Sequence, residues 1–523
     1  MRSTIKILLI LLGFVSILYV NSNFMDPDLG WHLRFGKEFS EGNFSYVDTY
    51  TWGYYGQSWI NHEWGGDIFL WQVYSRFDYL PLLLLMSILP WAAFLIMNRV
   101  FQKRITITSL VAALFAAWAV HHIFSVRLAS FSSLFLAILL WNLERLPAKK
   151  TYYFWPILFW VWSALHGSWA LGFIVIGVYV VGNLVALSLR GSTQMDKNWP
   201  LKTTLRVGLW SVISLIATLI NPYGIDLWKE VLAYLTNNYY KAHITEWVPS
   251  YTYPVYWQTI ILAGIGIAFF ILALRHKKLT VPQALLFVLF FVSAAKYKRQ
   301  VLYFAMIALP LISLTVQSAH NQLLNNPKAR AIIDAKIAKW TVWGLSLPLI
   351  VLLMIYHLSG VRWVTDVWAD EVILREYPMP AEAAKFLKQK IGVSNTFLFN
   401  EFAWGGYLNW ILPQAKIFLG GQGTATWRFS EKETMLERYH KIISGPDGLK
   451  EIESGPSQYI ILAKSVNLPL PDSVNRLLFN EAELNKYFNN SQTELEQSLT
   501  NSKRWKLIYE DGVARVWERE SKL

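Results

Sequence analysis

Long apolar segments separated by short polar connections dominate the sequence up to residue 359. Most of these segments approach the ~20 residues that an α-helix needs to cross the hydrocarbon core of a bilayer. The predicted membrane-spanning helices occupy residues 5–21, 79–98, 105–124, 128–143, 153–166, 169–189, 205–220, 256–274, 279–295, 300–318 and 341–358. The pattern predicts an α-helical polytopic membrane protein with about eleven transmembrane helices and a transmembrane domain over residues 1–359.

After residue 359 the pattern changes to shorter elements that alternate between helix and strand. Apolar residues recur at helical spacing over residues 381–390, so we expect a helix there. Runs typical of buried strands, and one hairpin, are predicted over residues 395–401, 415–421, 457–464 and 505–520. Residues 360–523 are therefore predicted to form a separate soluble α/β domain.

Composition supports a membrane protein and excludes several kinds of chemistry. Charged residues make up 16% of the chain, against about 25% in soluble domains. The absence of cysteine excludes disulfides, thiolate nucleophiles and Cys-ligated zinc. Residues 1–359 hold 28 Lys and Arg against 14 Asp and Glu, whereas residues 360–523 hold 20 against 21. The net charge of +13 therefore comes from the membrane half and does not indicate a nucleic-acid partner.

The distribution of Lys and Arg around the predicted spans predicts the orientation of the chain. If the spans alternate from an inside N-terminus, inside segments hold 19 Lys and Arg and outside segments hold 9. Cytoplasmic loops of membrane proteins carry such an excess. We therefore expect a cytoplasmic N-terminus, with the outer loop (residues 23–78) and the C-terminal domain both outside the cytoplasm.

The outer loop concentrates ionisable residues beside a membrane surface. They are Asp26, Asp28, His32, Asp48, His62, Glu63 and Asp67. Carboxylates beside an apolar layer are costly to desolvate. Together with histidine and tryptophan they suit general-base catalysis, a divalent cation such as Mg²⁺ or Mn²⁺, or stacking on sugars. The alternative is a solvated loop in which Asp26 or Asp28 only caps a helix.

Basic residues at outer helix ends depart from the expected orientation and need a reason. Arg127 follows two histidines, and Lys296, Lys298 and Arg299 lie between two predicted spans. Cations beside acyl chains on the outer face would hold a lipid phosphate. The alternative is that these side chains anchor helix ends by extending to the interface.

Further polar motifs fall on the same outer face. His166 lies in HGSWALG, NPYG occupies residues 221–224, and Glu246 lies in HITEWVP. A single histidine is more often structural than catalytic, and NPYG is first a turn signal. The glycine-rich segment 401–410 lacks the spacing of a phosphate loop. Segment 420–429 is either a ligand loop or a surface turn, and we favour the surface turn.

The order of these motifs resembles that in a group of bacterial multi-pass proteins allied to the GT-C glycosyltransferases, the superfamily that includes protein mannosyltransferases and aminoarabinose transferases. The motifs are DPDLGWHLRFG (26–36), VDTYTW (47–52), HEWGGD (62–67), HGSWALG, NPYG, EWVP, KYKRQVLYFAMIALP (296–310), FNEFAWGGYLNWILP (399–413) and WKLIYEDGVARVWER (505–519). The resemblance spans nearly the whole chain, and its specificity lies in the order of short motifs.

This resemblance implies a transferase of a bacterial cytoplasmic membrane that takes a sugar from a polyprenyl-phosphate donor and inverts its anomeric centre. Its acceptor would be a glycan, a lipid or a protein. The implied catalytic position falls on Asp28, with Asp26 as the alternative, and Glu63 is the second acidic position. A divalent metal, if one is used, would be held by Asp28 and Glu63. The implied substrate-binding residues are His32, His62, Arg127, His166, Glu246, Lys296, Lys298 and Arg299.

Two other functions are compatible with the sequence. A transporter or flippase for a lipid-linked sugar would carry ionisable groups at mid-membrane and broken helices in two related halves, whereas the predicted spans are nearly free of charge at their centres. A non-catalytic scaffold would use the C-terminal domain to bind a glycan or protein partner.

Overall fold

The computed structural model describes residues 2–100, 104–188, 199–328, 331, 336–364, 366–368, 379–392, 394–464, 471–488 and 493–520. The chain divides into two compact units. Unit 1 comprises Met1–Asn23, Leu83–Ile220 and Thr245–Trp363, and unit 2 comprises Phe24–Leu82, Asn221–Ile244 and Val364–Leu523. Two segments that the sequence assigned to the transmembrane domain thus fold with the C-terminal residues.

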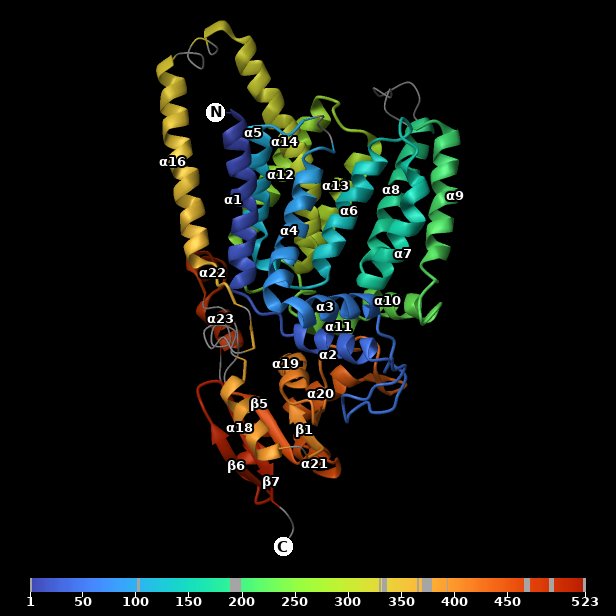
Figure 1. Cartoon of the computed structure of the whole chain (residues 1–523), viewed down its shortest axis with the longest axis vertical. Coiled ribbons are helices and arrows are strands. Elements are labelled where there is room, and N and C mark those ends of the chain that lie inside the picture. The colour runs from blue at the N-terminus through green and yellow to red at the C-terminus, as the bar shows by residue number, and fades with distance from the viewer. Residues whose placement is uncertain are drawn as a thin grey trace. The chain divides into compact units, whose positions relative to one another are not determined.

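Unit 1 is built from helices that run side by side (Figure 1). They are α1 (Arg2–Ser22), α4 (Tyr79–Met97, which begins in unit 2), α5 (Ile107–Ala119), η1 (His121–Ile123), α6 (Ala129–Leu143), η2 (Thr151–Phe154), α7 (Trp155–Leu165), α8 (Trp169–Ser188), α9 (Leu201–Ala217), α12 (Trp257–Arg275), α13 (Val281–Lys296), η3 (Lys298–Gln300), α14 (Val301–Asn325) and α16 (Lys336–Gly360). A helix occupies each of the eleven predicted spans.

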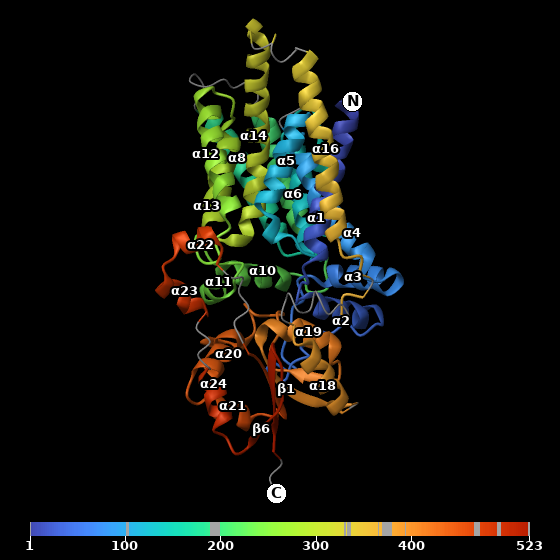
Figure 2. The same cartoon turned by 90° about the vertical axis from the view of Figure 1, so that its left-hand side faces the viewer.

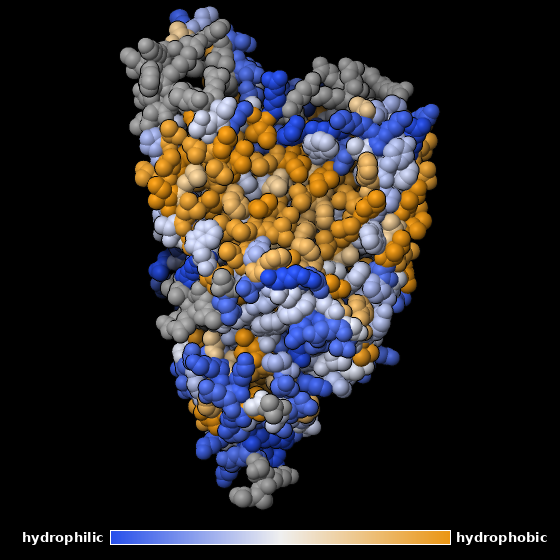
Figure 3. All heavy atoms as spheres, in the orientation of Figure 1, coloured by the Kyte–Doolittle hydropathy of each residue, from blue (hydrophilic) through white to orange (hydrophobic). Residues whose placement is uncertain are grey.

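Unit 1 has the length and surface of a membrane domain. Five of the described helices are long and apolar enough to cross a bilayer, namely α1, α4, α8, α12 and α14, and four shorter apolar helices accompany them. Hydrophobic side chains gather in a broad band over this unit (Figure 3). The chain is therefore a multi-pass membrane protein, while the count of eleven crossings stays a prediction.

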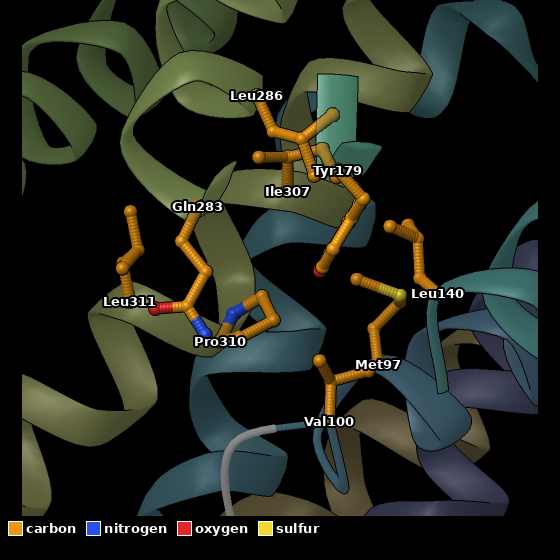
Figure 4. Close-up of a pocket in the computed structure, with 9 residues that line it drawn as sticks. All are labelled: Met97, Val100, Leu140, Tyr179, Gln283, Leu286, Ile307, Pro310 and Leu311. Carbon is orange, nitrogen blue, oxygen red and sulfur yellow. The ribbon is translucent and has the colours of Figure 1, made fainter. Parts of the chain in front are cut away.

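A small, mostly apolar cavity lies among the helices of unit 1 (Figure 4). Residues from five helices line it, among them Met97, Leu140, Tyr179, Gln283 and Ile307. Tyr179 and Gln283 both donate hydrogen bonds to the carboxylate of Glu144, with Gln283 Nε2 at 2.9 and 3.0 Å from its two oxygens. None of the predicted site residues lines this cavity, so it belongs to helix packing.

Unit 2 contains a five-stranded mixed sheet in the order β2-β1-β5-β7-β6. Its strands are β1 (Thr396–Asn400), β2 (Ala415–Ile417), β5 (Tyr459–Ala463), β6 (Trp505–Glu510) and β7 (Ala514–Arg519). β1 pairs in parallel with β2 and β5, and β7 pairs antiparallel with β5 and β6. All the predicted strands are present, and the predicted C-terminal α/β region is confirmed.

Helices cover both faces of this sheet. Figure 2 shows α18 (Ala381–Ile391) and α19 (Gly405–Ile411) on one face, with α20 (Met435–Ser444), α21 (Gly448–Ser454) and α24 (Glu494–Thr500) on the other. The remaining elements of unit 2 are α2 (Leu29–Ser40), α3 (Trp64–Phe77), α10 (Asp226–Thr236), α11 (Asn238–His243), η4 (Phe402–Trp404), β3 (Arg428–Ser430), β4 (Glu433–Thr434), α22 (Ser473–Leu478) and α23 (Glu481–Phe488).

Aromatic side chains fix the outer loop to the sheet. Trp31, Phe35 and Trp59 share one buried cluster with Phe399 and Phe418 of the C-terminal region. Each such ring removes ~150–250 Å² of surface from water, and burial of one apolar side chain stabilises a fold by roughly 1.5–3 kcal/mol. The outer loop is therefore a structural part of the α/β unit.

Backbone pairing adds to this attachment. Thr51 forms a parallel bridge with Ile417 in β2, and the Trp52 N–H donates to the Ile417 carbonyl over 2.8 Å. The indole Nε1 of Trp52 donates to the carbonyl of Leu398 over 3.1 Å. Asp48 holds the turn in this segment. Its side chain is fully buried and accepts a hydrogen bond from the Thr51 hydroxyl over 2.6 Å. Asp48 is therefore a turn-forming residue.

Candidate active site

Asp26 and Asp28 precede α2, and their carboxylates lie in different surroundings. Asp26 is buried, and its Oδ1 accepts a hydrogen bond from the backbone N–H of Asp28 over 3.0 Å. Asp28 occupies the N-cap position of α2, is partly exposed, and makes no side-chain hydrogen bond to the first turn of that described helix. A capping carboxylate would bind those N–H groups. Asp28 is therefore the more exposed of these two carboxylates.

Glycines surround Asp28 at close range. A methyl group on Gly421 would lie 2.3 Å from Asp28 Oδ1, and one on Gly406 would lie 2.1 Å from the carbonyl oxygen of Pro27. One on Gly30 would lie 2.2 Å from the Gly406 carbonyl oxygen. Only glycine permits such approach without displacement. The C-terminal domain therefore approaches the start of α2 closely, with Gly421 beside the Asp28 carboxylate and Gly406 beside the backbone of Pro27 and Asp28.

The segment that carries Gly421 is buried and held in place. The Oδ1 of the fully buried Asn400 accepts the Phe418 N–H over 2.9 Å, and its Nδ2 donates to the Leu419 carbonyl over 2.9 Å. Residues 422–425 are buried. The interpretation of this segment as a surface turn was wrong, because its glycines serve a close approach between two parts of unit 2.

His32 forms a buried pair with Asp67. Its Nδ1 lies 2.5 Å from Asp67 Oδ1, and the other Asp67 oxygen accepts from Asn61 Nδ2 over 2.6 Å. Gly36 permits this contact between α2 and α3, because a methyl group there would lie 2.0 Å from the Asp67 carbonyl oxygen. Asp67 is fully buried, and each of its two carboxylate oxygens has a hydrogen-bond partner. Buried polar groups are generally paired in this way.

The charge on His32 is stabilised by its neighbours. Burial alone would lower its pKa, but Asp67, which faces its Nδ1, together with Glu63 and Asp28, raises the pKa to about 9. His32 is therefore an imidazolium cation at neutral pH. Its Nε2 lies 3.7 Å from Glu63 Oε2. The positive charge of His32 reduces the electrostatic cost of placing Asp67 and Glu63 in buried positions.

Glu63 and His62 lie at the start of α3. Glu63 is mostly buried, and its backbone N–H donates to Asn61 Oδ1 over 3.0 Å. It occupies the N-cap position without a side-chain bond to the described first turn. The His62 ring lies 4.9 Å from the ring of Tyr234 in α10. The structure thus brings His32 close to Glu63 and Asp28, whereas the His62 ring lies against α10.

Glu230 is a further carboxylic acid of this unit that sequence reasoning missed. It is buried in α10, and the Thr426 hydroxyl donates to its Oε1 over 2.9 Å. Burial raises its pKa to about 8, so it is neutral at pH 7. The helical spacing in the sequence could have indicated its burial, because Glu230 shares one face of α10 with the buried apolar residues Leu227 and Val231.

A second candidate group lies in unit 1. Arg127 donates to Glu246 Oε1, and the Arg299 N–H donates to the Glu246 carbonyl over 2.9 Å. The guanidinium of Arg299 lies 4.7 Å from the ring centre of Trp247. Burial raises the Glu246 pKa, but Arg127 and Arg299 outweigh it and hold the pKa low. Two cations therefore share one carboxylate.

The two lysines of the same segment differ in exposure. Lys298 is mostly buried, and its Nζ donates to the carbonyl of Tyr253 over 3.1 Å. Lys296 is exposed, with its Nζ 5.4 Å from the ring centre of Tyr297. The ammonium of Lys298 thus has a role in holding the loop before α12, which Lys296 does not share.

His166 is embedded in a hydrogen-bonded cluster of unit 1. Its Nδ1 lies 2.8 Å from the Ser132 hydroxyl and accepts from the Ser168 N–H over 3.2 Å. The indole of Trp162 donates to the same Ser132 oxygen over 2.8 Å. These bonds join α6, α7 and the turn before α8, so the structural role foreseen for a single histidine fits His166.

A divalent cation was predicted on Asp28 and Glu63. Within the described ranges, no three His, Cys, Asp or Glu side chains are placed to hold a metal ion. The Glu63 side chain instead faces His32. A divalent cation on Asp28 and Glu63 therefore stays a prediction.

Fold and site together define a multi-pass membrane protein whose α/β unit carries a buried carboxylate–histidine cluster. No family model and no curated protein sequence matches the chain. Solved structures with a similar fold do exist.

The fold is similar to solved structures of an oligosaccharyltransferase from the archaeon Archaeoglobus fulgidus, a GT-C superfamily glycosyltransferase. For the enzyme AglB in complex with an inhibitory peptide and a dolichol-phosphate, the TM-score is 0.52 at 12% identity, over 92% of this chain and 71% of that one. For the enzyme tethered to an acceptor peptide the TM-score is 0.50 at 12% identity, over 93% and 71%. The predicted GT-C-like fold is confirmed.

Proposed function

We propose that this chain is a membrane glycosyltransferase that moves a sugar from a polyprenyl-phosphate donor to an acceptor outside the cytoplasm. The observation that carries this proposal is the setting of Asp28. Its carboxylate makes no side-chain capping bond to α2, is partly exposed, and lies beside Gly421 of the C-terminal domain. A carboxylate held this way suits proton transfer better than helix capping.

In the proposed reaction Asp28 accepts the proton of the acceptor hydroxyl or amide. The acceptor atom forms a bond to the anomeric carbon while the bond from that carbon to the phosphate oxygen breaks. The electron pair leaves with the polyprenyl phosphate, so one displacement inverts the anomeric centre. His32 faces Asp67 and Glu63, and its charge opposes the rise that burial causes in the pKa of Asp67.

The leaving phosphate needs cations to stabilise its developing charge. Arg127 and Arg299 are proposed for this task, because both guanidinium groups are fixed, one by Glu246 and one over Trp247. The exposed Lys296 would add a mobile charge at the same helix end. Preset donors of this kind stabilise charge without reorganising.

The similar archaeal enzyme supports a lipid-linked donor and an external acceptor, because it was solved with a dolichol-phosphate and with an acceptor peptide. We propose a bacterial cytoplasmic membrane as the location, with the N-terminus inside and unit 2 outside. The excess of Lys and Arg in the predicted inside segments supports this orientation. The acceptor class, whether glycan, lipid or protein, is left to experiment.

The proposal is tested with purified wild-type protein and a synthetic polyprenyl-phosphate hexose. We expect saturable donor binding, release of polyprenyl phosphate, and a product sugar with inverted anomeric configuration by NMR. Retention of configuration would contradict the single displacement. Movement of the donor between leaflets of proteoliposomes without cleavage would instead support a flippase.

A further inference from the structure

Gln422 is a buried amide with unused hydrogen-bonding capacity. Its side chain lies in the glycine-rich segment beside Asp28 and is 3% exposed. Neither Oε1 nor Nε2 has a hydrogen-bond partner among the residues that the structure describes. An amide has two donors and two acceptor lone pairs, and burying them unpaired is costly. Such a residue in a packed unit points to a ligand that completes it.

A second unpaired donor lies next to the same segment. The indole Nε1 of Trp31 is buried, and it too has no partner within the described part of the chain. A methyl group on Gly421 would lie 3.3 Å from this nitrogen and 2.3 Å from Asp28 Oδ1. One on Gly420 would lie 2.4 Å from Gln422 Oε1. The amide, the indole and the carboxylate therefore all contact two adjoining glycines.

We propose that Gln422 and Trp31 form a subsite that binds hydroxyl groups of the sugar ring presented to Asp28. This inference rests on the proposed function and deepens it. A sugar hydroxyl both donates and accepts, which matches an amide, and it accepts from an indole N–H. The carboxylate of Asp28 disfavours an anion there, so the lipid phosphate is excluded as the occupant.

The subsite explains why this segment contains consecutive glycines. A side chain at 420 would occupy the space of the Gln422 amide, and a side chain at 421 would displace Asp28. Glycine at both positions leaves room for the Asp28 carboxylate, the Trp31 indole and the Gln422 amide beside the same short stretch of backbone. Binding geometry and proton transfer would then be set by one rigid segment.

The test compares wild type with Gln422→Met, a change of similar volume that removes both polar atoms. Gln414→Met, at an exposed position of the same unit, is the matched control. Donor affinity is measured with a synthetic polyprenyl-phosphate hexose and its monodeoxy analogues. Melting temperature without ligand is measured for all three proteins.

We expect Gln422→Met to keep or raise the melting temperature, because it removes buried unpaired atoms. It should weaken binding of the parent donor by about 10- to 100-fold. One deoxy analogue should bind wild type more weakly than the parent donor does, by a similar factor. The same analogue and the parent donor should bind Gln422→Met with equal affinity. Gln414→Met should match wild type throughout.

Three results would overturn the subsite. A marked fall in melting temperature for Gln422→Met would show that the amide is paired inside the fold, for example to a buried water only. An equal response of both proteins to every deoxy analogue would show that Gln422 touches no hydroxyl, while the proposed function stands. Absence of donor binding to wild type would remove both proposals together.

Discussion

Gly421→Ala tests whether the position of the Asp28 carboxylate matters for turnover. The added methyl would lie 2.3 Å from Asp28 Oδ1, while ordinary contact begins near 3.4 Å, so the carboxylate must move by about 1.1 Å. A misplacement of ~1 Å at a reacting group costs up to ~100-fold in rate, or about 2.7 kcal/mol of activation free energy. The overpacking itself costs roughly 1–3 kcal/mol of stability. We therefore expect a folded protein with kcat reduced by about two orders of magnitude.

The assay is release of polyprenyl phosphate from a synthetic donor by purified protein. Gly512→Ala is the control, because a methyl group there meets nothing within 4 Å. Binding of the donor and the melting temperature separate a misplaced carboxylate from a damaged fold. If Gly421→Ala folds, binds donor and keeps the wild-type kcat, the position of Asp28 does not limit the reaction and the role given to it is wrong.

Three further outcomes follow from the structure. The pKa of His32 is raised from 6.5 to about 9, so the stabilising effect of its charge is fully present below about pH 6.5 and is lost as the pH rises through 9. The free energy of unfolding, measured with denaturant, should fall by up to about 3 kcal/mol over this range. His32→Gln should abolish this pH dependence. The pKa of Glu230 is raised to about 8 by burial, so stability should fall as pH rises from about 4.5 to 8, and thermal melts of Glu230→Gln should lack this fall. Arg299→Gln should weaken donor binding about 10-fold or more in a titration where Lys229→Gln, at an exposed position, binds like wild type.

The helices and strands could be predicted because their signals are local. Each predicted span lies on a helix, and each predicted strand is present. Apolar runs and alternating patterns depend only on neighbouring residues. The outcome was different for the outer loop, because its aromatic residues Trp31 and Trp59 share a buried cluster with Phe418, more than 350 positions away in the sequence. No local pattern indicates such a contact.

The candidate site could be predicted in its residue types but not in its pairing. The cluster of carboxylates and histidines in the outer loop was evident, and Asp28 was the favoured carboxylate. The partnership of His32 with Asp67 depends on how α2 packs against α3. Glu230 was missed because the sequence predicted no element around it, and Gln422 was missed because its segment was interpreted as a turn. Both side chains are buried, and this burial, which only the fold reveals, is what makes them candidate functional residues.

The most direct test of the central claim is donor cleavage by wild type beside Asp28→Asn and Asp26→Asn. We expect Asp28→Asn to fold and bind the donor but to lose cleavage by at least two orders of magnitude, because an amide cannot accept the proton. Asp26→Asn, which perturbs a buried turn contact, should lower stability and retain measurable cleavage. Wild-type cleavage by a folded Asp28→Asn variant would contradict the account.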